Sequence, residues 1–356
     1  MMTRRTGCSP SPCEPRGACK SYRSYESYGS YLIDWRFEMS GRRQLVGFIV
    51  IVVVAALLMP ACLWGQDPVP TKDEIAKMQA AAPEKPRVPP AKAHKLLVFS
   101  RSWGYKHTAR PFGAKAIEVM GKKTGAYEPV LIEEDDSLFE PQNLKQFDAV
   151  VLNNTNEEIF LPENFDKLPA EEQAKAKQRD EMLRKSFADY VRNGGGLAVI
   201  HAGVASFRTW PEFGEIMGAR FENHPWGAGS TVVLKIEEPD HPLTAAFKEP
   251  YFIVTDEIYQ LAAPYSRDNL RVLITVDPVK SKTTPEQKKL IRRQDNDFAM
   301  TYIKTYGKGR VFYNALGHQH ELFWNPIVLQ HDLDGLQFVL GDLNADATPS
   351  AKITKK

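Results

Sequence analysis

Residues 194–203 read Gly-Gly-Gly-Leu-Ala-Val-Ile-His-Ala-Gly, and this stretch decides the fold. A long charged segment, residues 169–193, precedes it, with acidic residues near its start and basic ones near its end, as in a helix. The glycines let the chain reverse tightly after that helix. The apolar run Leu197–Ile200 then predicts a buried strand that ends at His201. A helix, a tight turn and a buried strand in this order are typical of an α/β protein with a parallel sheet.

Other strand and helix patterns alternate on both sides of this stretch. Four antiparallel strand patterns without long helices between them predict an extension of the sheet edge. A polar excursion, Lys280–Asp297, is predicted to be a surface loop. The remaining predicted elements are strands over Lys95–Ser100, Glu128–Glu133, Phe147–Asn153 and Gly309–Leu316, helices over Arg110–Lys123 and Ile327–Leu340, and edge strands over Thr231–Ile236, Phe252–Thr255, Arg271–Val276 and Phe298–Thr305.

The N-terminal part of the chain differs in composition from the remainder. Residues 1–38 are rich in Ser, Tyr, Arg and Pro, which predicts a disordered extension, or a mis-assigned segment if translation starts at Met39. Residues 39–65 combine two arginines, an apolar run and a small-residue exit, the pattern of an export signal. Without cleavage, residues 45–64 would be retained as a membrane anchor, and lipidation of Cys62 is a further alternative. We expect a periplasmic or extracellular protein.

Three segments follow the leader. Residues 66–93 hold a short helical stretch and several prolines, which predict a stiff linker. Residues 94–345 have the size of one α/β domain, and residues 346–356 form a polar tail. Since all four cysteines lie at or before the leader, the domain contains neither a disulfide nor a cysteine nucleophile. The net charge of +2 predicts no nucleic-acid partner, and membrane contact only through the N-terminal segment.

Four histidines follow predicted strands or lie in loops near them: His107, His201, His224 and His318. Loops at the carboxyl ends of parallel strands meet in one crevice, where ligands bind. Imidazoles in that crevice can hold a metal ion such as Zn²⁺ or move protons, with His201, His107 and His318 as the catalytic candidates. The chain lacks a compact ligand motif such as His-Glu-x-x-His, so a metal site would be assembled from distant loops.

Polar residues near the same predicted strand ends add to this crevice. Glu257 is a candidate general acid or base, or an orienting group for a histidine, while Asp256 and Tyr259 are candidate substrate contacts. A solvated strand edge is the alternative interpretation. Asn154 could bind a sugar hydroxyl or cap the next turn.

Aromatic residues accompany the favoured histidines. Tyr105 stands in the run Gly-Tyr-Lys-His, and the domain's four tryptophans all lie within ten residues of a favoured histidine. A flat apolar ring can stack on a sugar, which predicts substrate contacts from Tyr105, Trp103, Trp210 and Trp226. Plain core packing remains the alternative for the tryptophans, Trp324 included.

With these motifs in place, the chain resembles the trehalose-utilisation (ThuA-like) family from Lys95 to about Leu343. The matching motifs occur in the family's order: 104–107 (Gly-Tyr-Lys-His), Asn153-Asn154, 194–196 with His201-Ala202, 210–213 (Trp-Pro-Glu-Phe), 221–225 (Phe-Glu-Asn-His-Pro), His241-Pro242, 256–259 (Asp-Glu-Ile-Tyr), 306–313 (Tyr-Gly-Lys-Gly-Arg-Val-Phe-Tyr) and 316–318 (Leu-Gly-His).

The resemblance implies a flavodoxin-like fold related to class I glutamine amidotransferase domains, with helices on both faces of a parallel sheet. In those enzymes a nucleophilic cysteine follows a strand, at the position that here reads His201-Ala202-Gly203. Because this chain has neither Cys nor Ser there, we do not expect cysteine-dependent glutamine hydrolysis. The family is linked to disaccharide metabolism, including the oxidation of sugars to 3-keto forms.

Three functions are compatible with these features. The first is an exported hydrolase or lyase that acts on a glycoside or 3-keto-sugar by histidine acid–base or metal-assisted chemistry. Keto-sugar chemistry is favoured over direct hydrolysis because no carboxylate pair has the spacing of an ordinary glycosidase. The second is a non-catalytic carbohydrate-binding domain, and the third is a metallohydrolase for another substrate.

Overall fold

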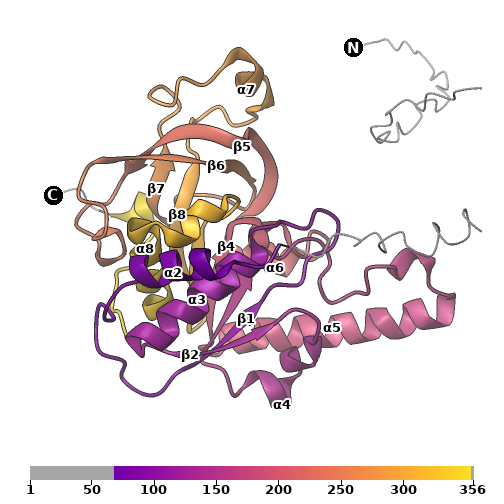
Figure 1. Cartoon of the computed structure of the whole chain (residues 1–356). Coiled ribbons are helices and arrows are strands. Elements are labelled where there is room, and N and C mark those ends of the chain that lie inside the picture. The colour runs from indigo at the N-terminus through magenta and orange to yellow at the C-terminus, as the bar shows by residue number, and fades with distance from the viewer. Residues whose placement is uncertain (1–67, 354–356) are drawn as a thin grey trace, which may run out of the picture. The chain divides into compact units, whose positions relative to one another are not determined.

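The computed structural model describes residues 68–353 (Figure 1). The expectations for residues 1–65 therefore lie outside the described residues. Within the described part, no helix combines the length and the apolar character that crossing a membrane requires.

The first half of the sheet is parallel and begins with β1 (Lys95–Phe99), which lies between β2 (Glu128–Ile132) and β3 (Ala149–Asn153). Next to β3 lie β4 (Gly196–Ile200) and then β9 (Gly309–Asn314). All four pairings in the order β2-β1-β3-β4-β9 are parallel. This is a flavodoxin-like strand order, and it confirms the predicted α/β fold class.

The sheet continues beyond β9 with antiparallel strands. They are β8 (Ala299–Tyr306), β7 (Arg271–Val276), β5 (Arg220–Ile236) and β6 (Tyr251–Ala262), in that order across the sheet. The predicted antiparallel edge is thus confirmed, but β5 and β6 are much longer than the sequence pattern indicates. Three register shifts between Phe221 and Ser230 accommodate Pro225 and two glycines inside β5.

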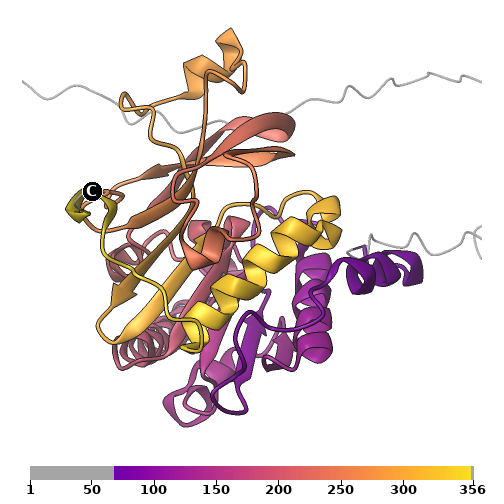
Figure 2. The same cartoon turned by 90° about the vertical axis from the view of Figure 1, so that its left-hand side faces the viewer.

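Helices cover both faces of the parallel strands, as Figures 1 and 2 show. On one face α3 (Arg110–Thr124) and α8 (Pro326–Leu340) contact each other, and α2 (Lys72–Ala81) packs on α3. On the other face α5 (Ala170–Arg192) contacts α4 (Pro141–Leu144) and α6 (Pro211–Met217). The remaining helical turns are η1 (Asp136–Phe139), η2 (Phe165–Lys167), η3 (His201–Ala205), η4 (Pro242–Thr244), η5 (His320–Trp324) and η6 (Ser350–Lys352).

One predicted loop contains a short helix. Residues 280–297 include α7 (Pro285–Leu290), where the sequence pattern indicates only a polar loop. The helix forms because Thr284 and Gln287 cap it reciprocally and Pro285 occupies its first turn. Because α7 is polar and buries no residue, apolar periodicity does not reveal it in the sequence.

The segment before β1, predicted as a stiff linker, packs against the domain. Met78 of α2 is completely buried. The Arg87 guanidinium donates to Asp334 of α8 at 2.9 and 2.5 Å. The Gln337 side chain accepts from the Arg87 backbone at 2.7 Å and donates to the Val88 carbonyl at 2.7 Å. Residues 72–88 are therefore part of the folded unit.

The Arg87–Asp334 ion pair should contribute measurably to stability. The Asp334 side chain is completely buried, so Arg87→Met leaves a buried carboxylate without its partner. We expect the free energy of unfolding to fall by about 2–3 kcal/mol in urea denaturation. The control Lys175→Met breaks an exposed pair with Glu171 and should cost less than about 0.5 kcal/mol. Equal losses in the two variants would contradict the packing role of residues 72–88.

Candidate metal centre and substrate cleft

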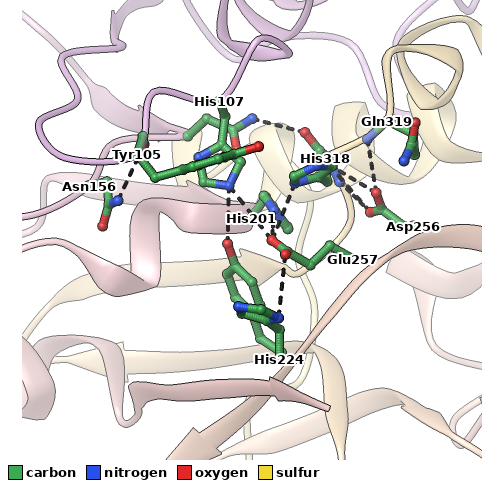
Figure 3. A network of polar contacts seen from close by, with 12 residues as sticks. Tyr105, His107, Asn156, His201, His224, Asp256, Glu257, His318 and Gln319 are labelled. Atoms are coloured by element: carbon green, nitrogen blue, oxygen red, sulfur yellow. Dashed lines mark hydrogen bonds and ion pairs between the residues drawn. The ribbon is translucent and has the colours of Figure 1, made fainter. Parts of the chain in front are cut away.

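Three of the predicted histidines meet one carboxylate at the carboxyl ends of the parallel strands (Figure 3). His107 lies between β1 and α3, His201 is the first residue after β4, and His318 follows β9. Glu257 comes from β6, in the antiparallel extension. One ligand atom from each of the four residues lies within 4.8 Å of the others. This is the geometry of a metal site assembled from distant loops.

His201 presents a lone pair to this cluster. Its side chain is completely buried, and its backbone has the left-handed φ of +48° that turns the chain sharply after β4. Nδ1 lies 2.7 Å from the Ala315 carbonyl, so Nδ1 carries the proton and donates it. Nε2 is left as an acceptor with no hydrogen-bond partner, 3.5 Å from Glu257 Oε2. Burial lowers the pKa of His201 to about 4, which keeps the ring neutral.

His107 and His318 approach the same carboxylate oxygen. His107 Nε2 lies 3.8 Å from Glu257 Oε2, and burial lowers the pKa of this imidazole. His318 Nδ1 lies 3.2 Å from the same oxygen. Burial also disfavours the charged form of His318, but Glu257 and Asp256 outweigh it and raise the pKa.

Glu257 is held as an anion. Burial opposes its ionisation, yet the contacts with His107 and His318 hold the pKa of its carboxyl well below the usual range. Its other oxygen, Oε1, lies 3.6 Å from Nδ1 of His224. His224 is predicted as a metal ligand, but its side chain is 52% exposed and stands on the outer side of Glu257. Since β5 begins at Arg220, His224 lies inside a strand and not in a loop.

Three imidazoles and one carboxylate form a donor set that suits Zn²⁺ and other first-row divalent ions. The fit rests on the buried Nε2 of His201, which is aimed at the carboxylate and lacks a partner. His201 also carries the second hydrogen bond, from Nδ1 to a carbonyl, that orients ligand histidines in metal proteins.

Asp256 and Asn154, predicted as substrate contacts, instead support the loop of His318. The buried Asp256 carboxylate accepts from the backbone N–H groups of Gly317, His318 and Gln319 at 2.9, 3.1 and 2.9 Å. Burial raises its pKa to about 7 despite these donors. The Asn154 side-chain amide donates to the Gly317 carbonyl at 3.1 Å. Both side chains are completely buried, which removes them from contact with a ligand.

Gly317 permits this arrangement. Its φ is +144°, and a Cβ atom there would lie 3.1 Å from Cβ of His201. A side chain at this position would therefore force the two ligand-bearing loops apart.

A cleft of about 360 Å³ opens beside the cluster, within the size range of small-molecule sites. The predicted contacts Tyr105 and Tyr259 both line it. Tyr259 stacks on His201 with ring centroids 4.5 Å apart, and its hydroxyl lies 3.3 Å from His107 Nε2. Tyr105 is exposed and packs edge-on against His107. The other lining residues are His107, Asn156, Glu157, Ala205, Arg208, Phe221, His224, Ala228, Glu257 and His318.

Six of these lining residues were not predicted from the sequence: Asn156, Glu157, Ala205, Arg208, Phe221 and Ala228. Asn156 and Glu157 follow β3, and Arg208 follows β4, so the rule that ligands bind beyond adjacent strand ends would have indicated them. Phe221 belongs to the Phe-Glu-Asn-His motif that also contains His224.

Trp103, Trp210 and Trp226, predicted as substrate contacts, do not line this cleft. Trp226 is buried edge-on against Phe298. Trp210 packs among other aromatic rings, and the Trp103 indole donates to the Leu161 carbonyl at 2.9 Å. Their large apolar surfaces pack against other parts of the protein, which agrees with the core-packing alternative.

The sequence model that defines the ThuA family, described as trehalose utilisation, matches residues 95–339. The chain belongs to this family. Its fold is similar to that of a ThuA-like protein from Bacteroides uniformis, with 20% identity, a TM-score of 0.53, and coverage of 71% of this chain and 94% of that one. A glutamine amidotransferase from Thermotoga maritima gives 9% identity and a TM-score of 0.40 over 70% of this chain and 100% of that one. No curated protein matches this ThuA chain.

Asp256→Asn should disturb the metal site without removing a ligand. The substitution replaces an acceptor oxygen with an amide donor beneath three backbone N–H groups, so the His318 loop loses a support. We expect Zn²⁺ affinity, measured by isothermal titration calorimetry, to fall about 10- to 100-fold. The control Asp268→Asn changes an exposed carboxylate elsewhere and should bind Zn²⁺ as the wild type does. Unchanged affinity in Asp256→Asn would show that the loop needs no such support.

Proposed function

We propose that this ThuA protein is a carbohydrate-active enzyme that uses a divalent metal ion, such as Zn²⁺, on a glycoside or 3-keto-sugar. The observation that carries the proposal is the convergence of His107, His201, His318 and Glu257 around the unpartnered Nε2 of His201. We also propose export through residues 39–65, on the strength of their signal-like pattern.

His201 suits the role of a ligand better than that of a general acid or base. Its ring is completely buried and is not among the residues that line the cleft, so a substrate does not reach it. A bound divalent ion supplies Lewis-acid polarisation of a carbonyl or hydroxyl oxygen of the substrate.

His224 is the residue placed to move a proton. It lines the cleft, it is half exposed, and its Nδ1 faces the free side of Glu257. A 3-keto-glycoside carries an acidic hydrogen on C2, next to the ketone. When His224 takes this proton, the released electron pair forms a C1=C2 double bond and the C1–O bond breaks. The departing oxygen takes up a proton from solvent, and addition of water to the double bond completes a net hydrolysis.

Two observations support a sugar as the substrate: the mixture of polar and aromatic groups in the cleft, and the family to which the chain belongs. Polar groups of Asn156, Arg208 and His224 stand beside the aromatic rings of Tyr105 and Phe221. Hydrogen-bonding groups next to flat apolar faces match a pyranose ring, which has polar edges and an apolar C–H face. The family's link to disaccharides and 3-keto-sugars adds the substrate class.

A non-catalytic carbohydrate-binding protein is the second candidate. It is favoured by the same aromatic rings and by the absence of Cys and Ser at positions 201–203. This candidate predicts saturable sugar binding without a product, and no dependence on the histidine cluster.

Metal analysis separates these two candidates. The purified protein should hold about one equivalent of a divalent ion by elemental analysis, and His201→Ala should lose it because one of four ligands is gone. His320→Gln is the matched control, since His320 lies two residues from His318 but stacks on Phe112 outside the cluster. Absence of metal from the wild type after incubation with Zn²⁺ would overturn the metal proposal and favour the binding protein.

Turnover tests the role of His224. With a 3-keto-disaccharide as substrate, the wild type should release free monosaccharide. His224→Gln should keep its metal but lose about 100-fold or more in kcat, because the proton acceptor is removed. Unchanged kcat in this variant would exclude His224 as the base. Binding of the disaccharide without release of monosaccharide by the wild type would reject the enzyme.

A further inference from the structure

The cleft contains a second pair of charged residues, Glu157 and Arg208, that the metal cluster does not need. Arg208 Nε lies 3.6 Å from Glu157 Oε1, beyond ordinary hydrogen-bond length. The two side chains are 49% and 38% exposed. An ion pair this exposed contributes only about 0–1 kcal/mol to stability. Stability therefore does not account for the pair.

The backbone is costly at Glu157 and at the residue before Arg208. Glu157 has a φ of +64°, and Phe207, the neighbour of Arg208, has a φ of +54°. Left-handed conformations of non-glycine residues cost about 1–3 kcal/mol each and gather at functional sites. The two segments hold each other in place, because Phe207 N–H donates to the Glu157 carbonyl at 2.9 Å and Glu157 N–H donates to the Ala205 carbonyl at 3.4 Å. This arrangement fixes both side chains at the cleft.

The charged groups of both side chains keep their hydrogen-bonding capacity for a ligand. Within residues 68–353 neither the Arg208 guanidinium nor the Glu157 carboxylate makes a hydrogen bond to the protein. The guanidinium lies over the Phe221 ring, 5.3 Å from its centroid, a cation–π contact that holds it beside the cleft. A donor fork and an acceptor thus stand side by side in the cleft.

We propose that Glu157 and Arg208 form the subsite that binds two neighbouring hydroxyl groups of a neutral sugar. A hydroxyl both donates and accepts, so one hydroxyl donates to the carboxylate while its neighbour accepts from the guanidinium. Because the opposite charges cancel, the subsite carries no net charge. The carboxylate of a uronate would be repelled by Glu157, and the ammonium group of an amino sugar would be repelled by Arg208. The subsite rests on the proposed sugar function and specifies its substrate class as uncharged pyranosides.

The test compares a neutral with an anionic sugar. Methyl glucoside and methyl glucuronide are titrated into the zinc-incubated wild type, Glu157→Gln, Arg208→Met and the distant control Lys175→Met by isothermal titration calorimetry. The wild type and Lys175→Met should bind the glucoside at least 10-fold more tightly than the glucuronide. Arg208→Met should weaken glucoside binding about 10-fold, and Glu157→Gln should reverse or abolish the preference, because Arg208 is then uncompensated.

Metal content and circular dichroism are recorded for every variant, and both should match the wild type. Glucoside affinity unchanged in both variants, or a wild type that does not bind the glucoside, overturns the subsite. Arg208→Met still tests the proposal if Glu157→Gln fails to fold. If the wild type holds no metal or shows no turnover, the proposed enzyme fails but the subsite does not, because the preference for neutral sugars is measured by binding.

Discussion

The arrangement of the site depends on the buried carboxylate of Glu257. An anion taken out of water is stable only when positive charge or hydrogen-bond donors surround it. His107, His201 and His318 converge on one of its oxygens, but the tautomer of His201 turns a lone pair toward it instead of a proton. The proposed divalent cation would resolve the conflict, because it would attract both the carboxylate and the lone pair. The same conflict makes Glu257 a poor solitary general base and a good ligand.

The two halves of the sheet contribute different parts of this site. The parallel half supplies the three histidines at its strand ends, and the antiparallel half supplies the acidic side chains through β6 (Figure 3). Asp256 and Glu257 are neighbours on that strand and have different roles. Asp256 accepts hydrogen bonds from the loop of His318, and Glu257 faces the three histidines of the proposed metal site. The parallel half alone would thus present three histidines without the carboxylate that completes the proposed metal site.

Local sequence patterns suffice for the parallel strands and for the histidines that follow them, because strand ends determine where those side chains emerge. Local patterns fail where pairing between segments distant in the sequence determines the position of a residue. Bulges carry β5 through Pro225, so His224 lies in a strand that no alternating pattern reveals. The tryptophans were placed by their distance along the chain from histidines, which does not say which way a ring points. Glu157 and Arg208 carry no sequence motif; they follow adjacent strands, and the bridge between Glu157 and Ser206 brings their two loops together at the cleft.

The turn after β4 shows how one backbone geometry can serve another chemistry. His201 adopts the left-handed conformation that lifts a side chain off the end of a strand, the position used for a nucleophile in related folds. Here the side chain turns into the protein, where Ala315 fixes its tautomer and Tyr259 covers its ring. A nucleophile must reach its substrate, whereas a ligand must keep one fixed direction and exclude water. Because His201 is completely buried, its ring keeps one direction and is shielded from water, as a ligand requires, but it cannot reach a substrate, as a nucleophile must. Its burial therefore favours metal-assisted over covalent chemistry at this turn.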